Sequence, residues 1–254
     1  GTTAVIDPFI NGTAIVNTGE WNMFTIVFDG NETGNDRLKI YLNGGSSNII
    51  TGYSGTPPTA LPTGSDSFYI GKGTNGNFDG KLSQFSIFDY ALSTGSISAL
   101  YNSGIPANPL AVGTPAVAYY DLGQGSAYAS GSAGIVEPNL AQATGSTVFD
   151  FDGTNPDHID CGTGIGDIIG DSYTGGMGIS LWFKNDNVAS TEQGLFIFSG
   201  GVDAWGEITA YFGYGIGLYV RVKGVLVRFN SHVFNLAPCS KGRVSHTCTF
   251  IFFS

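Results

Sequence analysis

The sequence predicts an all-β protein, an antiparallel β-sandwich with one short helix over residues 94–102. Apolar and polar side chains alternate in many short segments, which is the period of a half-buried strand. Glycine occupies 39 of 254 positions, and Asn, Ser and Thr crowd the segments between the apolar runs, as expected when tight turns join many strands. The 42% apolar content is sufficient for a buried core.

The first part of the chain contains a regular succession of strand-like segments. They are predicted at residues 4–6, 21–30, 38–44, 68–71 and 78–89. A helix follows at 94–102, and three prolines then occur between Ile105 and Pro115. Because proline beyond a helix end, in a stretch without apolar periodicity, is typical of a connection, the sequence predicts a linker at 106–115.

The second part of the chain continues the same pattern. Its strands are predicted at residues 116–122, 147–153, 158–162, 177–184, 195–199, 210–213, 217–222 and 225–229. The regularity of these segments supports a second stretch of sandwich after the linker.

Both parts resemble the laminin-G-like (concanavalin A-like) jelly-roll family. The strand order from Trp21 to Gly104 is similar to the C-terminal half of such a unit. After the linker, Ala118-Tyr119-Tyr120, then Phe151-Asp152-Gly153, then Ile179–Lys184 resemble the opening strands of its N-terminal half. The resemblance implies that residues 1–105 are the C-terminal part of one unit and residues 116–254 the N-terminal part of a second.

Half a sandwich exposes an apolar sheet face and unpaired strand edges, so each part needs completion. Three solutions are open: the missing parts belong to a longer polypeptide, the parts pair between copies, or they close on each other as one permuted sandwich. The first is favoured, because Gly1 and Ser254 both lie within patterned segments. Separate hydrophobic cores for the two parts would exclude the third.

The charge pattern excludes some partners. The net charge is −10, charged residues make up only 12% of the chain, and lysine and arginine form no cluster. A nucleic-acid partner is therefore not expected, since phosphate binding depends on clustered cations. A membrane span is not expected either, because no apolar run approaches the roughly 18–20 residues that a spanning helix needs.

No catalytic residue is predicted. Glycosidases of this fold carry two carboxylates that flank one bond. The nearest approach to that pattern is Asp203 and Glu207, whose glycine-rich surroundings indicate a turn rather than a strand. The sequence therefore favours a protein that is not an enzyme.

Calcium is the cofactor that the resemblance implies, since members of this family hold Ca²⁺ at the sandwich rim with loop carboxylates. Asp152 and Asp157 match the loop side of that pattern, and Asp79 and Asp89 are the corresponding acids in the first part. The alternative is a hairpin turn at each Asp-Gly, where the aspartate caps backbone amides.

Glycan recognition uses exposed aromatic rings that stack on sugars. Trp205, Tyr211 and Tyr214 have glycine neighbours and are the predicted ligand-binding residues, with rim packing as the alternative.

The expected function is a non-enzymatic binding or adhesion module of an extracellular or virion-surface protein, with a glycan or surface protein as ligand. The alternative is a structural assembly subunit, such as a capsid decoration or fibre component, that pairs with other copies or neighbouring chains and binds no small ligand. A glycoside hydrolase is the third possibility.

Overall fold

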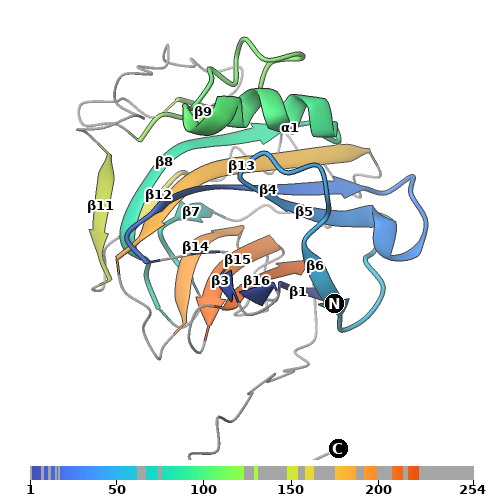
Figure 1. Ribbon diagram of the computed structural model, residues 1–254, viewed down its shortest axis with the longest axis horizontal. Coiled ribbons are helices and arrows are strands. Elements are labelled where there is room, and N and C mark those ends of the chain that lie inside the picture. The colour runs from blue at the N-terminus through green and yellow to red at the C-terminus, as the bar shows by residue number, and fades with distance from the viewer. Residues whose placement is uncertain are drawn as a thin grey trace, which may run out of the picture.

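The computed structural model describes residues 2–6, 9–10, 13–14, 16, 18–61, 67–73, 76–122, 129–130, 148–153, 158–162, 175–186, 192–198, 208–213 and 217–222. Two large β-sheets face each other, and one helix lies on the outer side of one of them (Figure 1). Pairing between the strands is antiparallel throughout. The predicted fold class, an antiparallel sandwich with a short helix, is confirmed.

We call the first sheet the β14 sheet. Its strand order is β12-β7-β14-β15-β16-β1-β6. The bounds of these strands are Ile159–Asp160 for β12, Phe68–Ile70 for β7, Gln193–Phe198 for β14, Ile208–Gly213 for β15, Gly217–Val222 for β16, Thr2–Ile6 for β1 and Ile50–Tyr53 for β6.

We call the second sheet the β13 sheet. Its order is β10-β9-β8-β13-β4-β5, and β11 also pairs with β8. The bounds are Ala129–Ser130 for β10, Ala118–Tyr120 for β9, Asp79–Phe88 for β8, Gly176–Asn185 for β13, Trp21–Asp29 for β4, Leu38–Leu42 for β5 and Phe149–Asp152 for β11. The separate hairpin of β2, Phe9–Ile10, and β3, Thr13–Ala14, completes the list of strands.

Strands from the two parts of the chain interleave in both sheets. β13, from the second part, lies between β4 and β8 of the first part, and β1 lies between β16 and β6. The described strands of residues 1–105 and 116–254 therefore complete each other within one sandwich. This is the permuted arrangement, and it replaces the expectation of two half-units that depend on sequence outside the chain.

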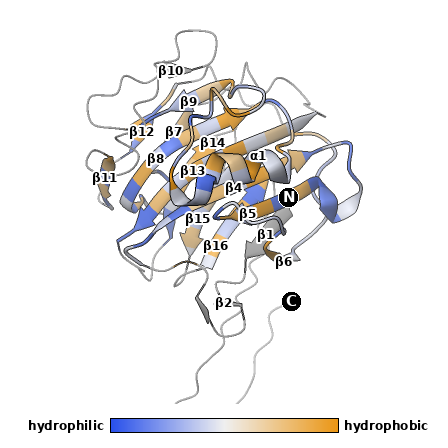
Figure 2. Cartoon of the chain, turned by 45° about the horizontal axis from the view of Figure 1, so that its top comes forward, coloured by the Kyte–Doolittle hydropathy of each residue, from blue (hydrophilic) through white to orange (hydrophobic). Residues whose placement is uncertain are grey.

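One hydrophobic core is shared by the two parts. Phe68 and Phe85, from the first part, contact Tyr120, Phe196 and Phe198 from the second, with ring centroids 4.4–6.4 Å apart. Figure 2 shows apolar residues recurring along the strands that supply this core. Separate cores, which would exclude the permuted sandwich, are not observed among the described residues.

The predicted linker at 106–115 is an ordered connection rather than a domain boundary. Helix α1, Thr94–Tyr101, begins at the N-cap Ser93, whose side chain accepts a hydrogen bond from the Ser96 N–H. The short 3₁₀ turn η2, Asn102–Gly104, follows it. The chain then lies against the apolar cluster under α1, with Ala116 buried, and the Val117 N–H donates to the Ile87 carbonyl at 2.8 Å.

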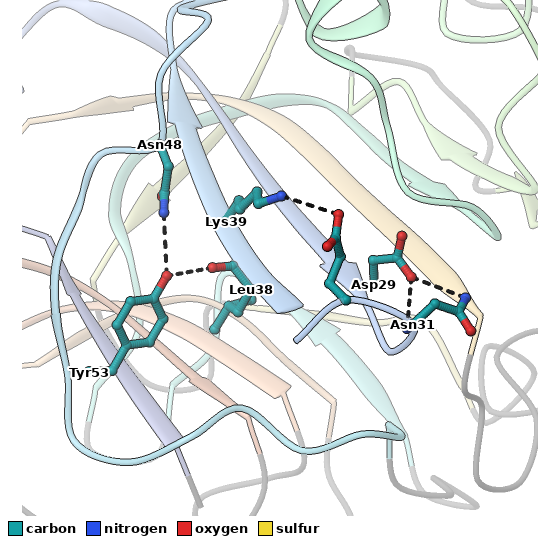
Figure 3. A network of polar contacts seen from close by, with 7 residues as sticks. Asp29, Asn31, Leu38, Lys39, Asn48 and Tyr53 are labelled. Atoms are coloured by element: carbon teal, nitrogen blue, oxygen red, sulfur yellow. Dashed lines mark hydrogen bonds and ion pairs between the residues drawn. The ribbon is translucent and has the colours of Figure 1, made fainter. Parts of the chain in front are cut away.

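The open edge of β5 is covered by its own loop (Figure 3). Asn48 Oδ1 accepts hydrogen bonds from the backbone N–H groups of Ile40 and Ile50, and the Tyr53 hydroxyl donates to the Leu38 carbonyl at 2.7 Å. A second 3₁₀ turn, η1, Gly34–Arg37, precedes β5. These contacts occupy backbone N–H and C=O groups that an exposed edge strand would offer to another chain, so β5 is protected from edge-to-edge pairing.

Buried acidic groups predict loss of stability at alkaline pH. Burial raises the pKa of the Cys161 thiol to about 12 and raises the pKa of the Tyr119 and Tyr120 hydroxyls above the usual value. The folded state therefore keeps protons that the unfolded chain releases above about pH 8.5–10. We expect these groups to leave the free energy of unfolding unchanged near neutral pH and to lower it between pH 9 and 12, measured by urea titration.

The matched control is Cys161→Ala, which removes one of these groups. Its free energy of unfolding should depend less steeply on pH above pH 9 than that of the unchanged protein. An equally steep decline in both proteins would contradict the assignment of Cys161 as a contributor.

Candidate ligand-binding face

The outer face of the β14 sheet lies on the side of the sandwich opposite helix α1 (Figure 1). Alternation along its strands sends every second side chain outward. In β16, Leu218, Val220 and Val222 enter the core, so Tyr219 and Arg221 lie on the outer face. The same rule places on this face Tyr69, His158, Asp160, Ile197, Thr209 and Tyr211.

Two stacked tyrosines lie at one end of this face. Tyr211 and Tyr219 are cross-strand partners, with ring centroids 5.3 Å apart and planes 15° from parallel, and both are half-buried. Glycines leave room for the rings. A Cβ atom at Gly213 would lie 3.1 Å from the Tyr219 ring, and one at Gly217 would lie 2.9 Å from it. The sequence thus forms a flat, partly exposed aromatic surface here.

A second aromatic group lies on β7 and its surroundings. The ring of His158 meets the edge of Tyr69, with centroids 5.3 Å apart and planes at 76°. The ammonium group of Lys72 lies 3.8 Å from the centre of the Tyr69 ring, a cation–π contact. Asp160 is the cross-strand partner of Tyr69 and is exposed. This group combines an aromatic ring with a cation and a carboxylate.

The middle of the face is buried. Ile197, Thr209 and Arg221 are 6%, 1% and 3% exposed, and the Thr209 hydroxyl donates to the Phe196 carbonyl at 3.0 Å. Among the described residues of β7, β12, β14, β15 and β16, the partly exposed aromatic side chains of this face therefore form two groups, the tyrosine pair and the group around Tyr69.

Carboxylates are scarce on this sheet. Its seven strands contain a single acidic residue, Asp160. Glycoside hydrolysis needs two carboxyl groups on either side of the scissile bond. The strands of this face supply no such pair, and Asp203 and Glu207 lie outside the described residues.

The predicted calcium ligands fall at two separate places. Asp79 and Asp152 are cross-strand partners in β8 and β11, although we expected them in two different units. Asp89 follows the far end of β8, a ten-residue strand, and is therefore about 30 Å from Asp79. Asp157 lies outside the described residues.

An ion-pair network occupies the rim beside Asp79. The Lys81 ammonium lies 2.7 Å from Asp186 and 3.0 Å from Asp150, and these charge-assisted hydrogen bonds, chiefly the one to Asp186, raise the pKa of Lys81. Within the ranges that the structure describes, no three His, Cys, Asp or Glu side chains form a group that could hold a metal ion. Asp79 and Asp152 would therefore need ligands from elsewhere to complete a calcium site.

One of the predicted ligand-binding residues lies on this face. Tyr211 lies on the outer face, as a binding role requires, whereas Trp205 and Tyr214 fall outside the described residues. Tyr219 and the group around Tyr69 were missed. The available signal was alternation in β16 and β7, where apolar neighbours on both sides of each tyrosine indicate that its ring points away from the core.

Comparison with known proteins gives one match. Residues 2–98 match the family model described as the concanavalin A-like lectin/glucanases superfamily. Curated proteins and solved structures yield no significant match. Among the described helices, none has the length and apolar character to cross a membrane. The matched residues supply strands to both sheets of the sandwich, so residues 2–98 are similar to the concanavalin A-like lectin/glucanases superfamily in a fold that agrees with it.

Proposed function

We propose that this protein is a non-enzymatic glycan-binding module of an extracellular or virion-surface protein. The observation that carries the proposal is the half-buried stack of Tyr211 and Tyr219 on the helix-free face of the sandwich. The superfamily description names lectins, which bind sugars, beside glucanases, which cleave them. The single acidic residue in the seven strands favours binding over cleavage.

Physical chemistry explains why this surface suits a sugar. The C–H groups on one side of a pyranose ring pack against an aromatic face, and a phenol hydroxyl adds a hydrogen bond at the edge. Tyr211 and Tyr219 are held by each other and by the close glycine backbone, so little side-chain freedom is lost when a ligand binds. A protein ligand would use the same rings as anchors.

A glycan array with the full chain tests the proposal, and Tyr211→Ala should weaken binding to the best ligand at least about ten-fold, the loss typical of a central aromatic anchor. Tyr211→Phe keeps the ring and should retain most of the affinity. The matched control is Tyr90→Ala, which removes a half-buried tyrosine that bonds the Thr114 carbonyl elsewhere on the chain. Equal losses for Tyr211→Ala and Tyr90→Ala would contradict a site at the tyrosine stack.

The array is run with and without chelator, because we also propose calcium at the rim with Asp79, Asp152 and Asp157 as ligands. Calcium-dependent binding that is lost in Asp152→Asn would support that site. Unchanged binding in chelator, together with an unchanged melting temperature, would reject it. Absence of binding to every glycan in both conditions would reject the lectin function itself.

An assembly subunit is the second candidate function. The interleaving of two chain parts in one sandwich favours it. A part that completes the sandwich of its own chain can complete the sandwich of another copy in the same way. Under this function, other copies of the chain are the partners and no small ligand is bound.

A further inference from the structure

We propose that two copies of this chain exchange halves, so that residues 118–222 of one copy complete the sandwich begun by residues 2–101 of the other. The hinge of this exchange is the segment from Asn102 to Val117. The partner is thus a second copy of the same chain, and the interface is the one already present inside each copy.

The exchanged interface is extensive and needs no new contact. β13 pairs with β4 over nine residues, from Gly176 opposite Asp29 to Lys184 opposite Trp21, and pairs with β8 on its other side. β1 inserts between β16 and β6 in the other sheet. The pairings of β13 with β4 and β8, and of β1 with β16, join one part of the chain to the other, so an exchanged dimer regains all of them.

The hinge carries local backbone strain in the closed form. Asn102 and Ser103 are consecutive, exposed, and both left-handed, with φ of 44° and 57°. A side chain in this region is strained, and serine tolerates the strain less well than asparagine does. Two such residues in succession at the end of α1 turn the chain back over the sheet. Opening the hinge lets both relax to ordinary backbone, which lowers the free energy of the exchanged form relative to the closed one.

Contacts of the segment after the turn act in the opposite direction. Pro106, Pro109 and Ala116 are buried against the sandwich, and the Ala107 N–H donates to the Leu100 carbonyl. Opening the hinge breaks those of these contacts that require the turn, and their loss destabilises the exchanged form. The balance makes exchange depend on protein concentration, with monomers favoured in dilute solution and dimers when the chain refolds at high concentration.

The first experiment mixes two single variants of the full chain, Thr25→Cys and Ser180→Cys. These residues are cross-strand partners in β4 and β13, with side-chain oxygens 3.3 Å apart, and neither variant alone has both thiols. The mixture is unfolded, refolded at high concentration and oxidised. Exchange predicts a covalent dimer with a 25–180 disulfide identified by peptide mass spectrometry. Mixed unchanged chains, which carry Cys161, Cys239 and Cys248, give the background.

A surface pair repeats the test without disturbing the buried sheet. Lys81→Cys and Asp150→Cys replace partially exposed cross-strand partners of β8 and β11, which also belong to the two different parts of the chain. An interchain 81–150 disulfide supports exchange even where the buried pair fails to fold. Dimers that form neither disulfide are joined by another surface and overturn the proposal, as does an exclusively monomeric product at every concentration.

A variant of the hinge tests whether backbone strain at Ser103 promotes the exchange. Ser103→Gly removes the penalty of one left-handed residue in the closed form, so the fraction of exchanged dimer should fall, roughly five-fold for each hinge in the dimer. The control, Ser46→Gly, makes the same change at an exposed loop serine outside the left-handed region and should leave the fraction unchanged. Equal effects of the two variants would overturn the role of the hinge. Glycan binding is not needed for any of these readouts, so the lectin proposal stands or falls separately.

Discussion

Residues 1–117 produced as a separate polypeptide will not fold into a sandwich. Removing the second part takes β13 from between β4 and β8 and takes β16 from beside β1, which alone leaves three unpaired strand edges. The core side of β8 would then lose Phe196, which packs on Phe85 from the facing sheet, and would lie against water. The stability of a small sheet depends on the apolar surface that it buries against another layer. Losing the facing layer therefore costs more than the whole free energy of folding of an ordinary domain, which is about 5–15 kcal/mol.

Circular dichroism and proton NMR dispersion measure this result. Residues 1–117 alone should show no cooperative thermal transition and should aggregate through the exposed edges. Mixing them with separately produced residues 118–254 should restore the transition, because the pairings are the same whether or not the peptide bond between the parts is present. A cooperative transition in residues 1–117 alone would show that they hold a core of their own.

Local pattern was enough to predict most strands. The predicted segment 78–89 contains β8, Asp79–Phe88, and the predicted helix at 94–102 contains α1, Thr94–Tyr101. These elements depend on alternation or on a capping serine, both of which are encoded within a few residues. The bulge at Gln84, with φ of 51°, was not predicted, because it arises where the Gln84 N–H donates to the Asp121 carbonyl of a distant segment.

The order of the strands in each sheet could not be predicted from local pattern. That β13 lies between β4 and β8 is a property of pairing across some 150 positions, and no local signal marks it. The family resemblance of the first part agrees with the match over residues 2–98, but the interpretation as two separate units did not predict the interleaving. The physical requirement that half a sandwich be completed pointed to the permuted solution as one of three.

At the candidate site, too, local features could be predicted from the sequence and long-range pairing could not. Tyr211 was predicted from its glycine neighbours, but its stacking partner, Tyr219, follows from the register of β15 and β16, which the sequence does not state. Asp79 and Asp152 were predicted as equivalent acids of two units and are neighbours instead, because β11 pairs with β8. Single candidate residues could be named from the sequence, whereas which of them lie side by side depended on topology.

Phe68→Ala will cause a large loss of stability in the shared core. Phe68 is fully buried and its ring contacts Phe85 of its own part and Tyr120, Phe196 and Phe198 of the other, stacking on Phe198 at 4.4 Å. Truncation leaves a cavity that rigid strands on both sides cannot fill, and it removes several aromatic pairs. We expect the free energy of unfolding to fall by about 3–5 kcal/mol.

Urea unfolding followed by tryptophan fluorescence measures this change, and it also tests whether the two parts unfold together. In a shared core the substitution in the first part must lower a single transition that reports on the second part as well, because Trp182 lies in β13. Ile105→Ala is the control, since Ile105 is 58% exposed and its truncation should change stability by less than about 0.5 kcal/mol. If Phe68→Ala produced two separate transitions, with the one reported by Trp182 unchanged, the parts would fold independently and the interleaved sandwich would be wrong.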